Sequence, residues 1–359
     1  MDKIDIKSLS KEELEAALKD LGGETYRARQ IFRWLYKIGV KSFDEMTDIP
    51  AGLRQKLKAK FHITHFTILD SKRSAPDGTA KYLFKLEDAN TVEAVFLPEE
   101  RRNTICLSSQ VGCKYGCSFC ASASLGFVRN LEPSEILEEV MAVRRIYPVS
   151  AITNLVFMGI GEPLDNYDNV MKAIRIFNDK DAFNIGARKM TISTCGLIPG
   201  IERLKREALQ VELSVSLHSA DDEVRSKLVP INKKYPLKNL IAACREYVKS
   251  TNRIITFEYT LMEGVNCSNK DAAALARLLK GLKCKVNTIS CNRIRQVRNI
   301  ESARMIPNPM RSRPYSGPSE KTIALFVKAL KTAGVNVTHR RPKGEDIDAG
   351  CGQLRIAKL

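Results

Sequence analysis

The pattern of hydrophobic and polar positions changes within the first hundred residues of the chain, from a helical repeat to short strand-like runs. In residues 1–60, apolar side chains recur every three or four positions, which is typical of amphipathic helices. Ser10 and Glu13 form a capping-box pattern at the start of one of these helices. Residues 61–100 change to short β-branched and aromatic runs separated by turn residues, which indicates two or three strands. We therefore expect a helical N-terminal domain at 1–60 and a β-rich connector at 61–100.

From residue 101 onward, strand-like and helix-like segments alternate. Apolar, β-branched runs lie at 103–109, 153–159, 189–194, 211–216, 253–260 and 285–290. Helix-like segments lie near 133–147, 167–179, 200–208, 237–250, 269–281 and 319–333. Six β–α units are fewer than the eight of a closed barrel, so the expected fold class for 101–340 is α/β, an open partial (β/α)6 barrel. One further strand precedes a glycine-rich tail at 341–359.

The charge of the chain is strongly positive, with 58 Lys and Arg against 41 Asp and Glu and a formal net charge of +17. Such an excess is typical of proteins that bind nucleic acid, although a merely solvated basic surface gives the same count. No run of about 18 apolar residues is present and the first residues are polar, so we expect neither a membrane span nor an export signal. Ten cysteines with no disulfide-like framework indicate a reducing cytoplasm.

Three cysteines in one short loop, Cys113, Cys117 and Cys120, carry the most specific chemical signal. Structural zinc sites close with four ligands, and a plant-type two-iron cluster needs a fourth cysteine. Three thiolates instead suit three irons of a [4Fe–4S] cluster and leave the fourth iron open. This spacing is the signature of radical S-adenosylmethionine (SAM) enzymes, in which SAM chelates the open iron. A zinc site that takes a remote fourth ligand, such as His218 or Cys106, is the alternative.

Polar or glycine-rich segments follow most of the strand-like runs, at the strand ends where parallel barrels place their reactive groups. These segments are Gly159–Pro163, Ser193–Gly196, Ser216–Ser219 and Asn292. Glu162 is either a carboxylate at a helix start or a partner for the ammonium group of SAM, with adjacent glycines that allow close approach. His218 is either a core histidine or a ribose or carboxylate contact. The grouping predicts one site on one face of the barrel.

Two cysteines outside the three-cysteine loop are also candidates for a chemical role. Cys351 lies between two glycines in DIDAGCGQL, where a flexible tail can carry a thiol to the mouth of a barrel. Cys106 lies on the first barrel strand, and alternation alone makes it a small buried side chain. We interpret the remaining cysteines as packing residues; they are Cys195, Cys244, Cys267, Cys284 and Cys291.

The motifs SSQVGCKYGCSFCA, FMGIGEP, STCG, SLH and GEDIDAGCGQL occur in this order along the chain. Together they resemble the RlmN/Cfr family of radical SAM methyltransferases, which methylate an adenine of bacterial 23S ribosomal RNA. The resemblance runs from the helical N-terminal segment to the tail, and the tail motif is its most specific part. It implies a [4Fe–4S] cluster on Cys113, Cys117 and Cys120 and two SAM molecules per turnover. The implied SAM contacts are Gly161, Glu162, Ser193, Ser216, Leu217, His218 and Asn292.

The resemblance also implies a mechanism. Cys351 accepts a methyl group from one SAM as a thiolate nucleophile. A 5′-deoxyadenosyl radical from the second SAM removes hydrogen from the S-methyl group, and the methylene radical adds to carbon 2 of adenine. Cys106 attacks the Cys351 sulfur to release the methylated RNA, which leaves a transient disulfide, and Glu93 is the implied proton acceptor. The implied partners are 23S rRNA, transfer RNA and a reducing protein such as flavodoxin or ferredoxin, for a monomer that does not bind membranes.

Some positions depart from the usual family pattern and leave alternatives open. The family usually has a proline after the asparagine that we align with Asn292, and Asn308 in IPNP is a second candidate; we prefer Asn292 because it keeps the strand register. Gly350 stands where alanine is usual, and CASAS replaces CATG after the cluster motif. A carbon-8 methyltransferase of the same family, which confers antibiotic resistance, is the alternative enzyme. A non-catalytic zinc-containing RNA-binding protein is the alternative from another class. We expect residues 1–60 and the Arg-rich loop 293–313 to contact RNA phosphates.

Overall fold

The computed structural model describes residues 3–147, 152–292 and 315–354. Within these ranges the α-helices are α1 (Lys11–Asp20), α2 (Arg27–Phe32), α3 (Ala51–Lys60), α4 (Pro133–Arg144), α5 (Tyr167–Asn178), α6 (Ile198–Leu204), α7 (Asp222–Leu228), α8 (Leu237–Thr251), α9 (Asn269–Leu279) and α10 (Glu320–Thr332). A π-helical segment at Arg33–Ile38 continues α2. Short 3-10 turns lie at Ile6–Ser8, Phe43–Glu45, Ala121–Leu125, Ala187–Lys189, Pro230–Lys233 and Glu345–Ile347.

The β-strands form one large sheet and two small ones. They are β1 (Ile4–Asp5), β2 (Phe61–His62), β3 (Thr67–Arg73), β4 (Ala80–Lys85), β5 (Thr91–Leu97), β6 (Thr104–Cys106), β7 (Gln110–Gly112), β8 (Phe127–Asn130), β9 (Asn154–Phe157), β10 (Met190–Thr194), β11 (Glu212–Ser216), β12 (Ile255–Leu261), β13 (Cys284–Ser290) and β14 (Val337–Arg340). The large sheet has the order β14-β13-β12-β11-β10-β9-β6-β5-β4-β3. Its β3 to β6 pairs are antiparallel, and all of its other pairs are parallel.

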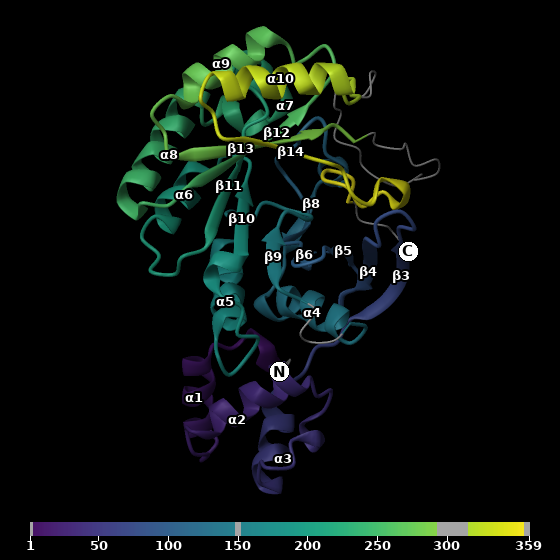
Figure 1. Ribbon diagram of the computed structural model, residues 1–359. Helices are drawn as coiled ribbons and strands as arrows, with labels where there is room; N and C mark the ends of the chain where they lie inside the picture. Colours follow the sequence, from purple (N-terminus) through teal and green to yellow (C-terminus); the bar gives the residue numbers. More distant parts are fainter. Residues whose placement is uncertain (1–2, 148–151, 293–314, 355–359) are drawn as a thin grey trace.

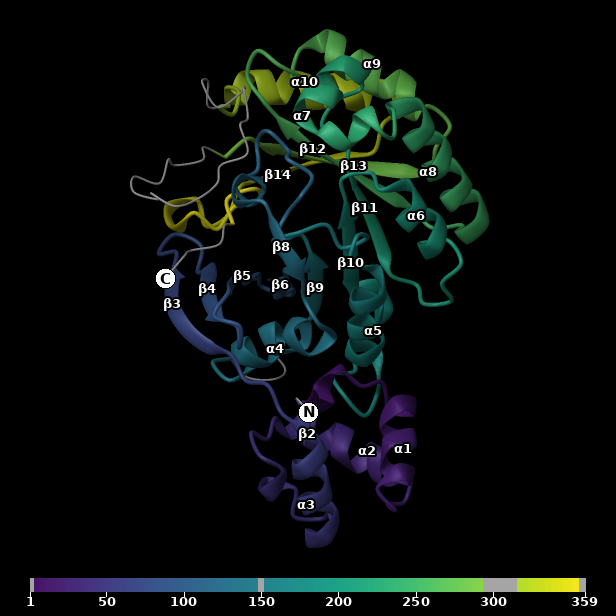
Figure 2. The ribbon, with the colours of Figure 1, turned by 180° about the vertical axis from the view of Figure 1, so that it is seen from behind.

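The parallel strands β6 and β9 to β13 confirm the predicted open (β/α)6 arrangement, and β14 extends it by one strand. Figures 1 and 2 show helices α5 to α10 on the outer side of the curved sheet, whose two edges, β14 and β3, remain apart. Neighbouring strands contribute Leu155, Ile192, Val215, Phe257 and Val286, all of which are buried. Burial of such apolar side chains between sheet and helices supplies the main stabilisation of the barrel.

Two local elements differ from the prediction. Helix α7 lies directly after the Ser216–Ser219 segment, where no helix is predicted, and its Asp221 caps it by accepting a hydrogen bond from Val224 N. Strands β7 and β8 form a small antiparallel pair that encloses the three-cysteine loop. A Cβ at Gly112, in β7, would lie 1.9 Å from the carbonyl oxygen of Gly126, so the close approach of these strands requires glycine there.

The helical N-terminal segment lies below the barrel in Figure 1 and contacts it through α4 and α5. Its first helix begins with the predicted capping box between Ser10 and Glu13. In the described part of the chain, no helix combines the length and the apolar character that a membrane span requires.

A buried ion pair joins the N-terminal segment to α4. The Nζ of Lys7 lies 2.6 Å from the Glu138 carboxylate, and both side chains are inaccessible to solvent. Burial alone would raise the pKa of Glu138, but contacts with His65, Lys7 and Arg145 overcome it and lower the pKa to about 2. Phe66 N donates a further hydrogen bond to this carboxylate, at 3.2 Å.

We expect Glu138→Gln to lower the free energy of unfolding by about 3–5 kcal/mol at neutral pH, because it leaves the Lys7 ammonium buried without its counter-charge. Because the folded-state pKa is below the unfolded value of 4.5, the wild-type pair stabilises the protein above pH 4.5 and loses this contribution as pH falls toward 2. Denaturant unfolding followed by fluorescence of the single tryptophan measures both effects. Asp168→Asn, which removes an exposed ion pair with Arg203, is the control and should cost at most about 1 kcal/mol. A loss for Glu138→Gln no larger than for the control would contradict this role.

Candidate active site

A cavity at the carboxyl ends of the parallel strands encloses about 1060 Å³ of space between atoms, part of it open to solvent. It brings together most of the predicted site residues from distant parts of the sequence. Those that line it are Cys113, Cys117, Cys120, Gly161, Glu162, Ser193, Ser216, His218, Asn292 and Cys351. Three predicted residues do not line it; they are Glu93, Cys106 and Leu217. A parallel barrel places its reactive groups at this face because its strand-end loops converge there.

The three-cysteine loop forms one wall of the cavity. Burial raises the pKa of Cys113 to about 12 and that of Cys117 well above its usual value, and the nearby Cys120 raises both pKa values further. Among the described residues, no three His, Cys, Asp or Glu side chains converge as ligands of a single metal ion. A cubane cluster takes each thiolate on a different iron, and its positive core would deprotonate these thiols, so three cysteines that line one cavity fit it.

The GIGEP segment after β9 holds a buried carboxylate beside the cysteine loop. Gly161 has a φ of +106°, and a Cβ there would lie 2.6 Å from the Cβ of Gln110, so only glycine fits. Glu162 Oε2 accepts a hydrogen bond from Cys195 N at 2.8 Å, and its Oε1 accepts one from Leu164 N at 3.2 Å. Burial nevertheless raises the pKa of Glu162. A buried carboxylate of this kind is stabilised by a cationic ligand, as the ammonium group of SAM would provide.

His218 lies at the end of β11 in a left-handed conformation, with a φ of +56°. Its Nδ1 accepts a hydrogen bond from Thr260 N at 3.0 Å. Burial, together with the charge of Arg225, lowers the pKa of His218 to about 3. The ring is therefore neutral and carries its proton on Nε2, which makes it a hydrogen-bond donor for a polar group in the cavity. Phe119 from the cysteine loop packs edge-on against the ring at 4.6 Å between centroids.

Arg225 on α7 is a site residue that sequence reasoning missed. Its guanidinium is buried and donates hydrogen bonds to Cys195 O at 2.8 Å, Ser216 O at 3.1 Å and Leu217 O at 3.1 Å. It therefore joins the loops that follow β10 and β11. Leu217 N in turn donates to Glu258 O, and the Leu217 side chain lies in the core. Both backbone groups and the side chain of Leu217 are thus occupied within the protein.

Glu258, Cys195 and Cys291 also line the cavity without having been predicted to do so. Glu258 stands in the middle of the apolar strand β12, and burial raises its pKa. A lone carboxylate in an otherwise apolar strand was the sequence signal that could have identified it. Cys195 and Cys291 are buried, as expected for packing cysteines, but they pack around the cluster loop with Cys117 and Phe119.

The tail brings Cys351 to the mouth of the cavity. Gly352 O accepts a hydrogen bond from Ala121 N at 2.7 Å, and Leu354 O accepts one from Ser122 Oγ at 2.6 Å. Both donors lie directly after Cys120, so the tail is docked on the cluster loop. Cys351 itself is exposed, although desolvation by nearby protein atoms raises its pKa.

Asn292 connects β13 to the tail. Its Nδ2 donates to Cys351 O at 3.3 Å, whereas its buried Oδ1 has no hydrogen-bond partner within the protein. A buried orphan acceptor that lines a cavity is a place for a ligand donor, which supports Asn292 as a SAM contact. A Cβ at Gly350 would lie 2.4 Å from Asn292 Nδ2, so the departure from the usual alanine brings the tail close to this amide. Asn308 lies outside the described residues.

Glu93 and Cys106 lie beside the cavity on adjacent strands. Cys106 on β6 is paired with Val95 on β5, so Glu93, two residues before Val95, shares the face of Cys106. Burial and the charge of nearby Cys351 raise the pKa of Cys106, which is therefore a protonated thiol. All ten cysteines are free, so the predicted disulfide is not formed in this state.

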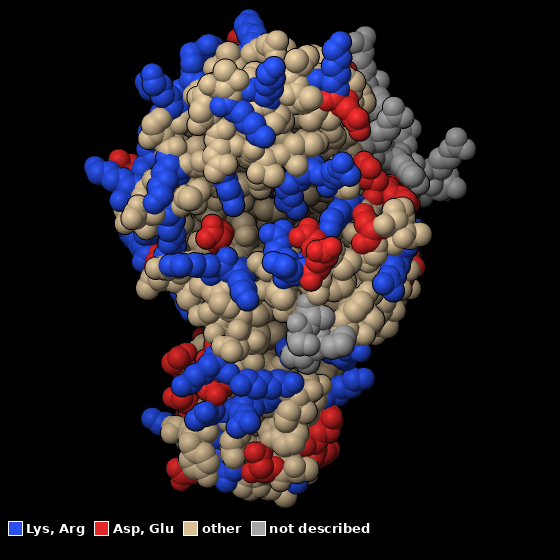
Figure 3. All heavy atoms as spheres, in the orientation of Figure 1, with Lys and Arg blue, Asp and Glu red and all other residues tan. Residues whose placement is uncertain are grey.

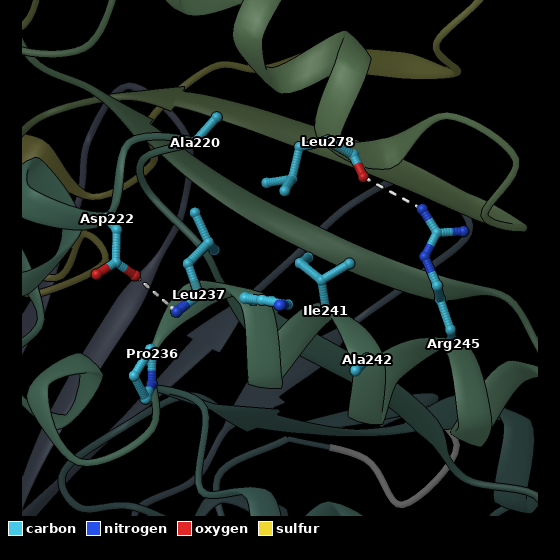
Figure 4. Close-up of a pocket in the computed structure, with 9 residues that line it drawn as sticks. Ala220, Asp222, Pro236, Leu237, Ile241, Ala242, Arg245 and Leu278 are labelled. Carbon is cyan, nitrogen blue, oxygen red and sulfur yellow. Dashed lines mark hydrogen bonds between the residues drawn. The ribbon is translucent and has the colours of Figure 1, made fainter.

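A second hollow, which encloses about 960 Å³ of space between atoms and is partly open to solvent, lies on the outer surface between α8 and α9. Figure 4 shows Leu237, Ile241 and Leu278 around it, with Asp222 bonded to the backbone N of Leu237 and Arg245 bonded to the carbonyl of Leu278. Asp222 and Arg245 thus hold neighbouring segments together, and no predicted site residue lines the hollow. The strand-end cavity is therefore the candidate active site.

Comparison with known proteins agrees with this geometry. The sequence profile of the Radical SAM superfamily matches residues 107–278, and that of the Ribosomal RNA large subunit methyltransferase N-terminal domain matches residues 4–63. A probable dual-specificity RNA methyltransferase RlmN from Thermoanaerobacter sp. (strain X514) is 44% identical over 350 residues, which cover 98% of this chain and 97% of that protein. A protein of the same name from Bacillus thuringiensis subsp. konkukian (strain 97-27) is 46% identical over 98% of this chain and 93% of its own length.

A solved structure gives the same result. The crystal structure of a radical SAM methyltransferase from Sphaerobacter thermophilus is 42% identical to this chain and has a TM-score of 0.89. It covers 98% of this chain and 99% of its own. Identity at this level over nearly the whole length shows that the chain is an enzyme and belongs to the RlmN family of radical SAM methyltransferases.

Proposed function

We propose that this enzyme adds a methyl group to carbon 2 of an adenine in 23S rRNA, and also in transfer RNA, through a methylcysteine intermediate on Cys351. The observation that carries the proposal is the docking of Cys351 at the mouth of the cavity that the three cluster cysteines line. The printed name of the relatives, dual-specificity RNA methyltransferase, supports RNA as the substrate. Reduced thiols and the absence of a membrane-spanning helix in the described residues suit a cytoplasmic enzyme.

The residues of the cavity fit a cluster and SAM. Cys113, Cys117 and Cys120 would hold a [4Fe–4S] cluster, which when bound supplies the electron that cleaves SAM into methionine and a 5′-deoxyadenosyl radical. A reducing protein such as flavodoxin or ferredoxin would provide that electron. Glu162 would bind the SAM ammonium group, and the remaining contacts would come from Gly161, Ser193, Ser216, His218 and Asn292. Leu217, predicted as a further contact, would instead anchor the segment between Ser216 and His218 in the core. Two SAM molecules are consumed per turnover because one supplies the methyl group and the other the radical.

Cys351 and Cys106 divide the chemistry between them. Cys351 is the exposed thiol, so it is suited to accept a methyl group from SAM and to carry the carbon to the adenine ring. The radical adduct would first give up its unpaired electron to the oxidised cluster. Cys106 then attacks Cys351 Sγ: a sulfur–sulfur bond forms, the sulfur–carbon bond breaks, and the ring-bound carbon gains a proton and becomes a methyl group. The raised pKa of Cys106 keeps its thiol protonated before this attack, so the thiol must first lose a proton to an acceptor. Glu93, on the same face of the sheet, suits this role.

The surface supports RNA as the partner. Figure 3 shows Lys and Arg side chains around a hollow in the middle of the barrel and over the upper part of the N-terminal segment. Within that segment Arg33 and Lys37 are exposed and four residues apart, on one side of the π-helical stretch. Positive groups of this kind bind the phosphates that all RNA sequences share. The Arg-rich loop 293–313, which we also expect to contact RNA, lies outside the described residues.

We expect RNA affinity to fall about a thousandfold or more between about 50 and 200 mM salt, as six to ten phosphate contacts require. Arg33→Ala combined with Lys37→Ala should lower the slope of log affinity against log salt by about one unit for each phosphate that is no longer bound. Lys331→Ala on α10, also exposed, is the matched control and should leave the slope unchanged. An affinity that hardly varies with salt would refute phosphate binding and leave the net charge of +17 as a determinant of solubility.

The position of the new methyl group tests the proposed function. RNA treated with the reconstituted enzyme is digested to nucleosides, which are separated by liquid chromatography beside 2-methyladenosine and 8-methyladenosine standards and identified by mass spectrometry. It should yield 2-methyladenosine from both 23S rRNA and transfer RNA. Formation of 8-methyladenosine would instead assign the enzyme to the carbon-8 activity of the same family.

A further inference from the structure

The C-terminal tail reaches from β14 at one edge of the sheet to the β3–β4 hairpin at the other (Figures 1 and 2). Gly344 N donates to Asp77 Oδ2 at 2.9 Å, in the turn between β3 and β4. Gly344 and Asp348 both adopt left-handed backbone conformations, and Ala349 N donates to Gly344 O at 2.9 Å. Residues 344–349 are therefore a compact loop seated on the connector strands, directly before Cys351.

Lys81 on β4 contacts both Glu93 and this loop. Its Nζ lies 3.0 Å from Glu93 Oε1 and donates to the Asp348 carbonyl oxygen at 3.1 Å. The pairing of Leu83 with Glu93 places Lys81 diagonally across from Glu93 on the same face of the sheet. Asp348 is three residues before Cys351, so one ammonium group links the carboxylate and the tail that carries the thiol.

The contacts of Lys81 with Glu93 and Asp348 are strong because they are almost completely shielded from solvent. The Lys81 and Glu93 side chains are only 10% and 8% exposed, so the pair is weakly screened by salt. A nearby opposite charge favours the ionised form of a carboxyl group, and hydrogen bonds to charged donors are stronger than neutral ones. Removal of the ammonium group would leave the buried Glu93 carboxyl without this counter-charge and the Asp348 carbonyl without this donor.

We propose that Lys81 is a positioning residue for the reaction: its ammonium group holds the Glu93 carboxyl group and the tail in place, so that Cys351 stays at the cavity mouth. This inference rests on the proposed roles of Glu93 as proton acceptor and Cys351 as methyl carrier. Lys81 acts through these two residues and forms no bond to the substrate. Loss of the Lys81 ammonium group should therefore slow turnover and make the tail more mobile, but should not change the binding of RNA.

The test compares Lys81→Met and Lys81→Arg in the full-length holoenzyme, with Lys85→Met as the control because Lys85 is exposed on the same strand and face. Hydrogen–deuterium exchange of the amides of residues 344–354 measures tail docking. Lys81→Met should raise this exchange by about tenfold or more, because it removes a charge-assisted hydrogen bond. It should lower kcat by about tenfold with KM for RNA unchanged, and Lys81→Arg should restore both because its guanidinium keeps charge and donors.

Unchanged exchange in Lys81→Met, a change confined to KM, or failure of Lys81→Arg to recover either property would each overturn the proposal. If Lys81→Met exchanges rapidly throughout the chain, Lys81→Gln, which keeps a donor and lacks the charge, takes its place with the same expected results. The Glu93→Gln variant tests the role of Glu93 as proton acceptor separately from the role of Lys81 in tail docking. Full activity of Glu93→Gln would reject Glu93 as the proton acceptor of the proposed function, and the tail-exchange result for Lys81 would still decide the docking role.

Discussion

Replacement of Cys351 by Ala is expected to abolish both methylation of the protein and modification of RNA, whereas replacement of Cys106 by Ala should trap RNA on the protein. Cys351 is the exposed thiol at the cavity mouth, so its loss removes the only proposed acceptor of the methyl group. Cys106 acts only after the carbon–carbon bond has formed. Without it, the protein accepts the methyl group, reacts with adenine and cannot break the sulfur–carbon bond. Denaturing gels and intact-mass measurement detect the methylated protein and the covalent adduct.

Cys284→Ala is the matched control for both variants, because Cys284 lies at the opposite end of β13 and does not line the cavity. It should methylate RNA at the wild-type rate. Identical behaviour of the Cys106 and Cys351 variants, with no adduct in the former, would mean that Cys106 has no resolving role. Cys106 would then be a packing residue on β6 next to the active site.

Replacement of Cys113, Cys117 or Cys120 by Ala is expected to reduce SAM cleavage to background. Each thiolate would hold a different iron, so the loss of one opens a second coordination position and destabilises the cluster. Iron and sulfide content, the anaerobic visible spectrum and the yield of 5′-deoxyadenosine measure the effect. The Cys284→Ala variant should retain the cluster. Formation of 5′-deoxyadenosine by a triple Ala variant would refute the assignment of the cluster ligands.

The alternation of strands and helices in the barrel could be predicted because each strand is a short apolar run and each predicted helix repeats its apolar positions every three or four residues. The cysteine loop could be identified because its ligands are local in sequence, within Cys113–Cys120. Helix α7 was missed because it has fewer than three turns and begins with polar residues. Its Arg225 was missed for the same reason, since its role depends on carbonyl groups of strand-end loops that are distant in sequence.

Contacts that depend on strand register were also beyond sequence reasoning. Nothing in the local pattern of β4 distinguishes Lys81 from Lys85, which is two periods of the strand away on the same face. The difference arises only from the antiparallel pairing with β5 and from the return of the tail to Asp348. Glu93 could be singled out only by resemblance to a known family, because a single carboxylate in a strand has no distinctive spacing.

The isotopic composition of the transferred methyl group distinguishes transfer through Cys351 from direct transfer from SAM to RNA. The reaction is run with SAM whose methyl group carries three deuterium atoms, and the product nucleoside is analysed by mass spectrometry. Transfer through a methylene on Cys351 removes one deuterium as the radical forms and adds one hydrogen at release, so we expect 2-methyladenosine with two deuterium atoms in its methyl group. A product that retains all three would show direct transfer from SAM to RNA and would contradict the methylcysteine mechanism.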